Sequence, residues 1–236
     1  METKQLYVKE TPILNYSDPR IQDLIEEKIW RNLNDEEKIK AIYNFVRDDI
    51  KFGYNLSDDR SAAAILNDGY GQCNTKATLL MALLRAVGIR NRIHGFTIDK
   101  ALQKGAITGI WYRLSPQSIL HSWVEVFLEG HWYFLEGVIL DKEYLTKLQE
   151  QNKECATTFC GFGVYTTHFL NPPIDWDRNN TFIQDQGINQ DFGLFNTPDE
   201  FYQKHQQKLN PIKKFLYQNI VRHLMNRNVN RIRDGI

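Results

Sequence analysis

Cysteine is scarce in this sequence: only Cys73, Cys155 and Cys160 occur among 236 residues. Three unevenly spaced cysteines are too few for the disulfide framework of a small secreted domain, so we expect them to be reduced. The sequence also lacks a run of about 18 uncharged apolar residues, and its first residues do not combine a basic stretch with an apolar one. These absences predict a cytoplasmic protein without a membrane span.

Acidic residues are missing from one part of the chain. Between Lys204 and Arg233 there are eight Lys or Arg and no Asp or Glu, although the net charge of the whole chain is zero. The rest of the chain carries the compensating negative charge, which favours docking of the basic segment on its own acidic body. A surface or partner role is the alternative. Nucleic acid is disfavoured as that partner, because no aromatic residues are interleaved with the basic ones in a pattern that stacks bases.

The hydrophobic content of 42% is enough for one full core. One domain with an appendage is therefore the natural division of the chain. We place the domain at residues 1–203, with its core at about residues 34–141. The appendage is a basic helical segment at residues 204–236.

The first half of the sequence predicts helices. Asp18 before a proline starts the first, and Asn34 with Glu37 three residues later starts the second. The stretch RSAAAILNDG predicts a short third helix. A fourth begins at or next to Cys73, within GYGQCNTKATLLMALLRAVGIR, and stops at Gly88, a residue suited to the left-handed conformation that closes helices.

After this helix the hydrophobic period changes from 3.6 to 2. RNRIHGFTID alternates weakly, whereas HSWVEVFL and HWYFLE are strong strands separated by the two residues Glu129 and Gly130, which predicts a hairpin. Beyond Asp141 the pattern weakens, and we expect loops and short strands up to Phe195, followed by the basic C-terminal helices. The order of elements predicts an α+β protein with an antiparallel sheet.

The position of Cys73 suits a nucleophile. A cysteine in the first turn of a helix lies near unpaired backbone N–H groups and the positive end of the helix dipole, which favour thiolate over thiol. Glycines at positions 69 and 71 allow a tight turn and leave room for a substrate near the backbone. The competing interpretation is a buried core cysteine, since cysteine is among the most buried residue types.

The hairpin predicts a partner for such a nucleophile. A two-residue turn pairs Leu128 with His131, and extending this pairing puts His121 and Glu136 on the same face as diagonal neighbours, roughly 7 Å apart at the backbone. A carboxylate at that distance can hydrogen-bond an imidazole. The competing carboxylate is Asp141, which has the opposite parity unless a bulge near residue 137 reverses it.

Two sequence blocks carry a resemblance to a known family. GYGQCNTKATLLMALLRAVGIRNRIHGF and HSWVEVFLEGHWYFLE are similar to the cysteine and histidine blocks of the transglutaminase-like superfamily, which has a papain-like fold. The resemblance covers about residues 50–141. It implies N-terminal helices with the nucleophile helix packed on an antiparallel sheet, followed here by a C-terminal helical segment. It also implies that Cys73 is the nucleophile and His121 the general base, with Glu136 where the family usually has aspartate.

The implied reaction is attack of the Cys73 thiolate on an amide or ester carbonyl of a peptide-like substrate, giving a thioester that water or an amine resolves. The Cys73 backbone N–H would hold the oxyanion with one polar side chain. The candidates for that side chain are Tyr54, Asn67 and Gln72. A catalytically degenerate binding module, or an acyltransferase with the same triad, is the alternative function.

Metal sites are poorly supported, and we expect neither a metal nor a cofactor. DWDRN at residues 175–179 imitates the start of a calcium loop, but Asn180 stands where the loop needs glycine and Gln186 where it needs glutamate. A zinc site would lack a fourth ligand and the usual short cysteine spacing. Its possible ligands are Cys155, Cys160 and His168.

Overall fold

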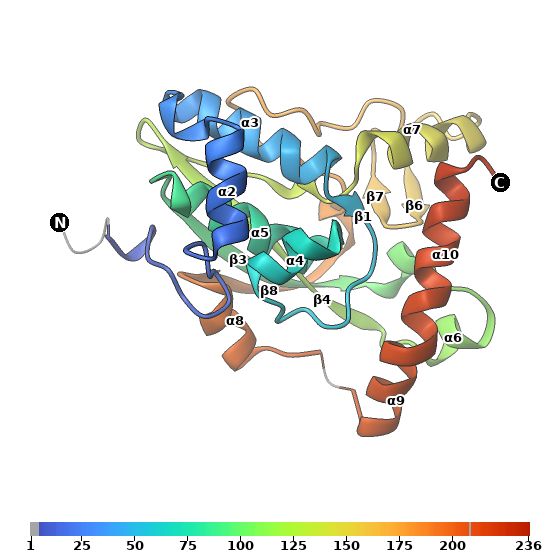
Figure 1. Cartoon of the computed structure of the whole chain (residues 1–236). Coiled ribbons are helices and arrows are strands. Elements are labelled where there is room, and N and C mark those ends of the chain that lie inside the picture. Colours follow the sequence, from blue (N-terminus) through green and yellow to red (C-terminus); the bar gives the residue numbers. More distant parts are fainter. Residues whose placement is uncertain (1–4, 208) are drawn as a thin grey trace.

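The computed structural model describes residues 5–207 and 209–236 (Figure 1). Its N-terminal half is helical, and the predicted start signals are confirmed. The Asp18 side chain accepts a hydrogen bond from the Arg20 N–H, and Asn34 and Glu37 form a reciprocal capping box. The helices of this half are α2 (Pro19–Glu27), α3 (Asp35–Asp48), α4 (Ala62–Asp68) and α5 (Cys73–Ala86), with a short turn of 3₁₀ helix at Trp30–Asn32.

A four-stranded antiparallel sheet packs against α5. Its order is β5-β4-β3-β8, and every neighbouring pair is antiparallel. The side chains of α5 from Cys73 to Arg85 are all buried, because the sheet lies on one side of this helix and α3 and α4 lie on others (Figure 1). The predicted α+β fold is confirmed. The strands of the sheet are β3 (Asn91–Asp99), β4 (Ser118–Leu128), β5 (His131–Phe134) and β8 (Ile188–Phe195).

Smaller elements complete the body. β1 (Lys51–Phe52) and β2 (Tyr70–Gly71) form a parallel pair just before α5, and β6 (Phe159–Gly161) and β7 (Val164–Thr166) form an antiparallel pair. The connection between β3 and β4 contains a 3₁₀ turn, η2 (Lys100–Gln103), and the short helix α6 (Gly109–Leu114).

The β4–β5 hairpin has the predicted register near its turn. Leu128 pairs with His131, and the two turn residues, Glu129 and Gly130, both have positive φ angles, 47° and 89°. The expectation that the pairing extends to Glu136 is wrong. β5 ends at Phe134, and the Leu135 N–H still donates to the Val124 carbonyl. The chain then forms the 3₁₀ turn η3 (Glu136–Val138), because the next N–H that would face β4, that of Gly137, donates to the carbonyl and hydroxyl of Thr181 instead.

One helix was missed by the sequence analysis. We expected loops after Asp141, but α7 (Lys142–Gln151) begins there. The Asp141 carboxylate caps it by accepting a hydrogen bond from the Tyr144 N–H at 2.9 Å. Tyr144, Leu145 and Leu148 are buried at helical spacing, so a start signal and a helical period were both present in the sequence.

The C-terminal segment is helical, as predicted, and lies along one edge of the molecule beside α6 and α7 (Figure 1). Its inner side buries Val221, Met225, Val229 and Ile232. Among its described residues, only Arg233 forms an ion pair with the body, at 2.6 Å from Asp141. Apolar burial therefore contributes more than charge attraction to docking of this segment. Its elements are α9 (Pro211–Leu216), the π-helical turn η5 (Tyr217–Val221) and α10 (Arg222–Arg233), whereas α8 (Pro198–Lys204) precedes it and packs against β3 and β8.

Lys76 is fully buried on α5, and its ammonium group donates to the Arg47 carbonyl at 2.9 Å. Burial lowers the pKa of Lys76 to about 7, although the charges of Asp141 and Asp48 oppose the shift. A lysine in an unfolded chain titrates near about 10.4. Between these two values the unfolded state binds more protons, so Lys76 destabilises the fold fully below pH 7 and progressively less as the pH rises toward 10.

We expect Lys76→Met to raise the free energy of unfolding by on the order of 1–3 kcal/mol at pH 6, because the variant has no charge to desolvate. The gain should shrink between pH 7 and pH 10. Urea unfolding at several pH values measures it, with Lys147→Met as a control, because Lys147 is paired with Glu150 at the surface. A gain that stays constant over this pH range would contradict the prediction.

Candidate active site

Cys73 is the first residue of α5 and follows a tight turn. Gly69 closes α4 with a φ of 71°, as its predicted role in a turn requires. Gly71 has a different role from the one we expected. A Cβ atom there would lie 2.7 Å from the Thr75 hydroxyl, so this glycine makes room for α5 itself and not for a substrate. The Cys73 side chain is 8% exposed.

His121 and Glu136 are brought together in the interior. Both side chains are completely buried, and the His121 Nε2 lies 3.0 Å from the Glu136 Oε1. The second carboxylate oxygen, Oε2, accepts hydrogen bonds from the backbone N–H groups of Ile183 and Gln184 at 2.7 and 2.9 Å. Three donors thus fix the carboxylate, although it belongs to η3 and not to the predicted strand.

The protonation of His121 follows from this geometry. Because Nε2 donates to the carboxylate, Nδ1 is the nitrogen left for Cys73, and it has no hydrogen-bond partner among the described residues. Burial lowers the pKa of His121, but the Cys73 thiolate and then Glu136 outweigh burial and raise this pKa to about 10. The raised pKa favours the protonated form of the His121 ring.

Asp141, the competing carboxylate, is occupied elsewhere. Its oxygens accept hydrogen bonds from the N–H groups of Phe52 and Tyr144 and from the Arg233 guanidinium. Burial raises the pKa of Asp141, but Arg233 and the two N–H donors more than offset it, and the net shift is downward. This residue joins β1, α7 and α10, which makes it structural.

Asn74 is a site residue that the sequence analysis missed. Its amide nitrogen donates to the Leu120 carbonyl at 3.0 Å, and its amide oxygen accepts from the Ser122 hydroxyl at 2.9 Å. Leu120 and Ser122 flank His121 on β4, so the residue after Cys73 fixes the strand that carries His121. The available signal was a run of polar residues, 74–76, at the start of a helix that is otherwise apolar.

The three candidates for the oxyanion donor have different surroundings. Tyr54 is 5% exposed, and burial, followed by the charges of Tyr144 and Cys73, raises the pKa of Tyr54 well above its usual value. Its hydroxyl therefore stays protonated near the thiol. Gln72 is held by the Asn55 N–H and the carboxylate of residue 58. Asn67 is exposed on α4, away from the buried groups that surround the thiol.

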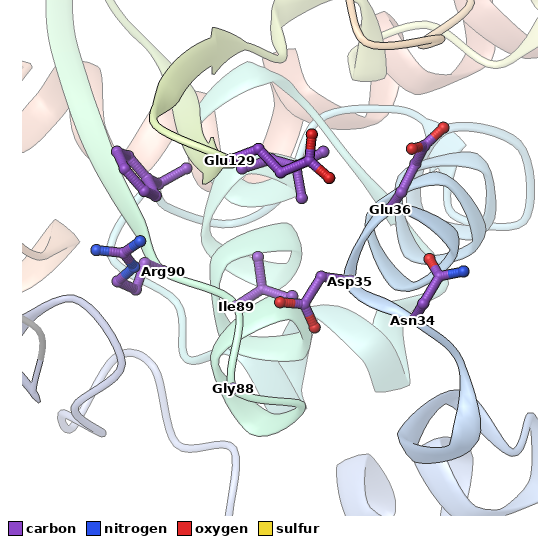
Figure 2. A pocket seen from close by; sticks show the side chains of 9 residues that line it. Asn34, Asp35, Glu36, Gly88, Ile89, Arg90 and Glu129 are labelled. Carbon is purple, nitrogen blue, oxygen red and sulfur yellow. The ribbon is translucent and has the colours of Figure 1, made fainter.

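A surface pocket of about 330 Å³ lies at the other end of α5. Figure 2 shows Asp35, Glu36 and Glu129 around it, with Arg90 on the side away from Glu36. α5 has 14 residues and is about 21 Å long, so this pocket, which includes Gly88, is remote from Cys73. It takes no part in the candidate active site.

Neither a metal-binding cluster nor a membrane-spanning helix occurs within residues 5–207 and 209–236. In these ranges no group of three or more His, Cys, Asp or Glu side chains is placed to hold a metal ion. In the same ranges no helix combines the length and the apolar character needed to cross a bilayer.

Known proteins resemble the chain at the level of family and fold. Residues 23–137 match the family model of the transglutaminase-like superfamily. Among solved structures, a candidate cysteine protease from Cytophaga hutchinsonii is 14% identical, over 82% of this chain and 47% of that chain, with a TM-score of 0.45. Red sea bream transglutaminase is 18% identical, over 58% of this chain and 31% of that chain, with a TM-score of 0.37. No curated protein sequence matches significantly.

The chain spans less than half the length of both of these solved proteins. The family match includes both sequence blocks that carry the resemblance, together with Cys73, His121 and Glu136. Residues 23–137 of the chain are therefore similar to the transglutaminase-like superfamily.

Proposed function

We propose that the protein is a cysteine-dependent acyl-transfer enzyme that acts on amide bonds of a peptide-like substrate. Cys73 is the nucleophile, His121 the general base and Glu136 the residue that orients the base. One observation supports this proposal above the others. A fully buried imidazole is held by a fixed carboxylate through Nε2, while its free Nδ1 is left to a thiol whose thiolate form raises the imidazole pKa.

The reaction follows from these positions. Nδ1 of His121 takes the thiol proton, and the sulfur of Cys73 forms a bond to the substrate carbonyl carbon, giving a tetrahedral oxyanion. The oxyanion collapses, the C–N bond breaks, and the leaving amine takes the proton from His121. Water or a second amine, deprotonated by the same nitrogen, then attacks the thioester carbonyl and releases Cys73.

Two groups are placed to stabilise the oxyanion. The Cys73 N–H is in the first turn of α5 and has no intrahelical acceptor, so it is available to a developing negative charge. The protonated Tyr54 hydroxyl is the second donor in our proposal, because this side chain is buried close enough to feel the charge of Cys73.

Substrate access to the thiol is narrow. Cys73 is 8% exposed and His121 is not exposed at all. α8 contributes Tyr202 and the C-terminal segment Tyr217, and the pKa values of both tyrosines are raised by burial and also by the charge of Cys73. The C-terminal segment also contributes Gln207, whose side chain accepts from the Leu120 N–H at 2.9 Å. A peptide substrate therefore has to displace part of this cover.

Alkylation of the three cysteines tests the proposal. We expect iodoacetamide to modify Cys73 at pH 6.5 at least about tenfold faster than Cys155 or Cys160, because only Cys73 has an imidazolium partner. Solvent exposure alone would predict the opposite order of rates, since Cys73 is the most buried of the three thiols. Partial desolvation and the charge of Asp99 raise the pKa of the Cys160 thiol, which makes it a slow internal control.

Mass spectrometry of peptides after timed alkylation gives the three rates, and His121→Gln should bring the Cys73 rate down to that of the other two. Equal rates in the wild-type protein would contradict the enzymatic proposal and favour a catalytically inactive binding module with the same fold.

A further inference from the structure

The C-terminal helix exposes a row of large apolar side chains on its outer side. Ile212 is 71% exposed, Phe215 63%, Ile220 41% and Leu224 39%. We call these four residues, with Arg227 and Arg231 after them, the outer row. Isolated exposed apolar residues are ordinary, but a continuous row on one helix marks an interaction surface.

The π-helical turn keeps this row on one face. Steps of three or four residues follow one face of an α-helix, whereas the step from Phe215 to Ile220 is five. That step spans η5 (Tyr217–Val221), in which the i to i+5 bonding accommodates one extra residue. Beyond the turn, steps of four, three and four lead through Leu224 to Arg227 and Arg231, which are both exposed.

The outer row is not needed to attach the helix to the body. Val221, Met225, Val229 and Ile232 form that attachment on the inner side and are at most 8% exposed. α6 extends the exposed apolar surface with Ile110 and Leu114, which are 56% and 49% exposed. The two elements are adjacent, because the Lys213 ammonium group donates to the Leu114 carbonyl at 3.1 Å.

The charge of this surface indicates its partner. Between Lys204 and Arg233 the sequence has eight basic residues and no acidic one. The surface belongs to a helix on the edge of the molecule (Figure 1). Apolar side chains flanked by cations on such a helix match the acyl boundary and the anionic headgroups of a lipid surface.

We propose that the outer row docks on an anionic lipid bilayer. Ile212, Phe215, Ile220 and Leu224 enter the headgroup region, and the exposed Arg227 and Arg231 contact the phosphates. This docking leaves the inner side of the helix, and hence its packing on the body, unchanged. It is independent of the reaction at Cys73.

Sedimentation of the full chain with vesicles tests the proposal. We expect binding to vesicles of phosphatidylcholine and phosphatidylserine to be at least about tenfold tighter than to phosphatidylcholine alone, and to weaken with added salt. The double variant Ile212→Ser and Phe215→Ser should lose at least about tenfold in affinity for the anionic vesicles. Leu170→Ser is the matched control, because Leu170 is 49% exposed but lies outside the C-terminal segment.

Unchanged thermal stability and an unchanged rate of Cys73 alkylation would show that the double variant is folded. Failure of the wild-type chain to bind anionic vesicles would overturn the proposal, as would equal losses in the double variant and in Leu170→Ser. A dimer in solution that the double variant abolishes, without vesicle binding by the wild type, would also overturn it and would assign the outer row to contact between two copies.

Discussion

Replacing Glu136 with Gln is expected to lower the rate of Cys73 alkylation at pH 6 by about 100-fold or more, with little change in stability. The substitution keeps the size of the side chain and removes its charge. In the proposed mechanism the carboxylate stabilises the imidazolium and fixes the tautomer that leaves Nδ1 free for the thiol. Without the charge, the acid limb of the pH profile of alkylation should move to higher pH.

The surrounding backbone fixes the orientation of the amide that replaces the Glu136 carboxylate. The N–H groups of Ile183 and Gln184 both point at one oxygen of Glu136, so after the substitution the amide oxygen of the new side chain has to occupy that position. The NH₂ group of the same amide then faces Nε2 of His121 and can only donate to it. The ring is driven to the tautomer with its proton on Nδ1, which cannot accept a proton from the thiol.

Asp141→Asn is the matched control for this experiment. Asp141 caps α7 and pairs with Arg233, so its replacement should lower the urea midpoint while leaving the alkylation profile of Cys73 close to that of the wild type. The opposite pattern, with Asp141→Asn slowing alkylation more than Glu136→Gln does, would show that Glu136 is not the residue that orients His121.

Asn74→Ala is the second substitution with a large expected effect. It removes the hydrogen bonds to the Leu120 carbonyl and the Ser122 hydroxyl and leaves both groups buried without a partner, which should lower stability by about 1–3 kcal/mol. Because these residues flank His121, the ring should lose its fixed distance to the thiol. We expect Cys73 alkylation at pH 6.5 to slow by about tenfold or more.

Asn91→Ala separates positioning from stability. Asn91 is also buried. Its amide nitrogen donates to the carbonyls of Met81 and Ile89 and its amide oxygen accepts from the Arg85 guanidinium, but it lies at the far end of α5. It should lose comparable stability without slowing alkylation of Cys73. In a double-mutant cycle, Ser122→Ala should lower the free energy of unfolding less when Asn74 is already replaced by Ala than it does in the wild-type protein. Equal slowing in Asn74→Ala and Asn91→Ala would reduce Asn74 to a purely structural residue.

The sequence by itself determined the elements whose causes are local. The caps at Asp18 and Asn34 involve donors two or three residues away, and the register near the hairpin turn depends on two residues, Glu129 and Gly130. The thiol at a helix start and the histidine on the next strong strand were visible for the same reason. The helix at 142–151 has local causes too, a cap at Asp141 and a helical period, although loops and short strands were expected there.

Only the tertiary structure decided which hydrogen bonds hold the residues of the candidate site in place. The strand ends before Glu136 because the Gly137 N–H donates to Thr181 and not to β4, and the Glu136 carboxylate is fixed by N–H groups 47 and 48 residues away. Asp141 is bound to an N–H 89 residues away, which no local pattern records. The burial of Asn74 likewise depends on β4. Hydrogen bonds between residues so far apart in the sequence form only when the core has packed. The sequence motifs therefore predict which side chains form the candidate site, but not which hydrogen bonds orient those side chains.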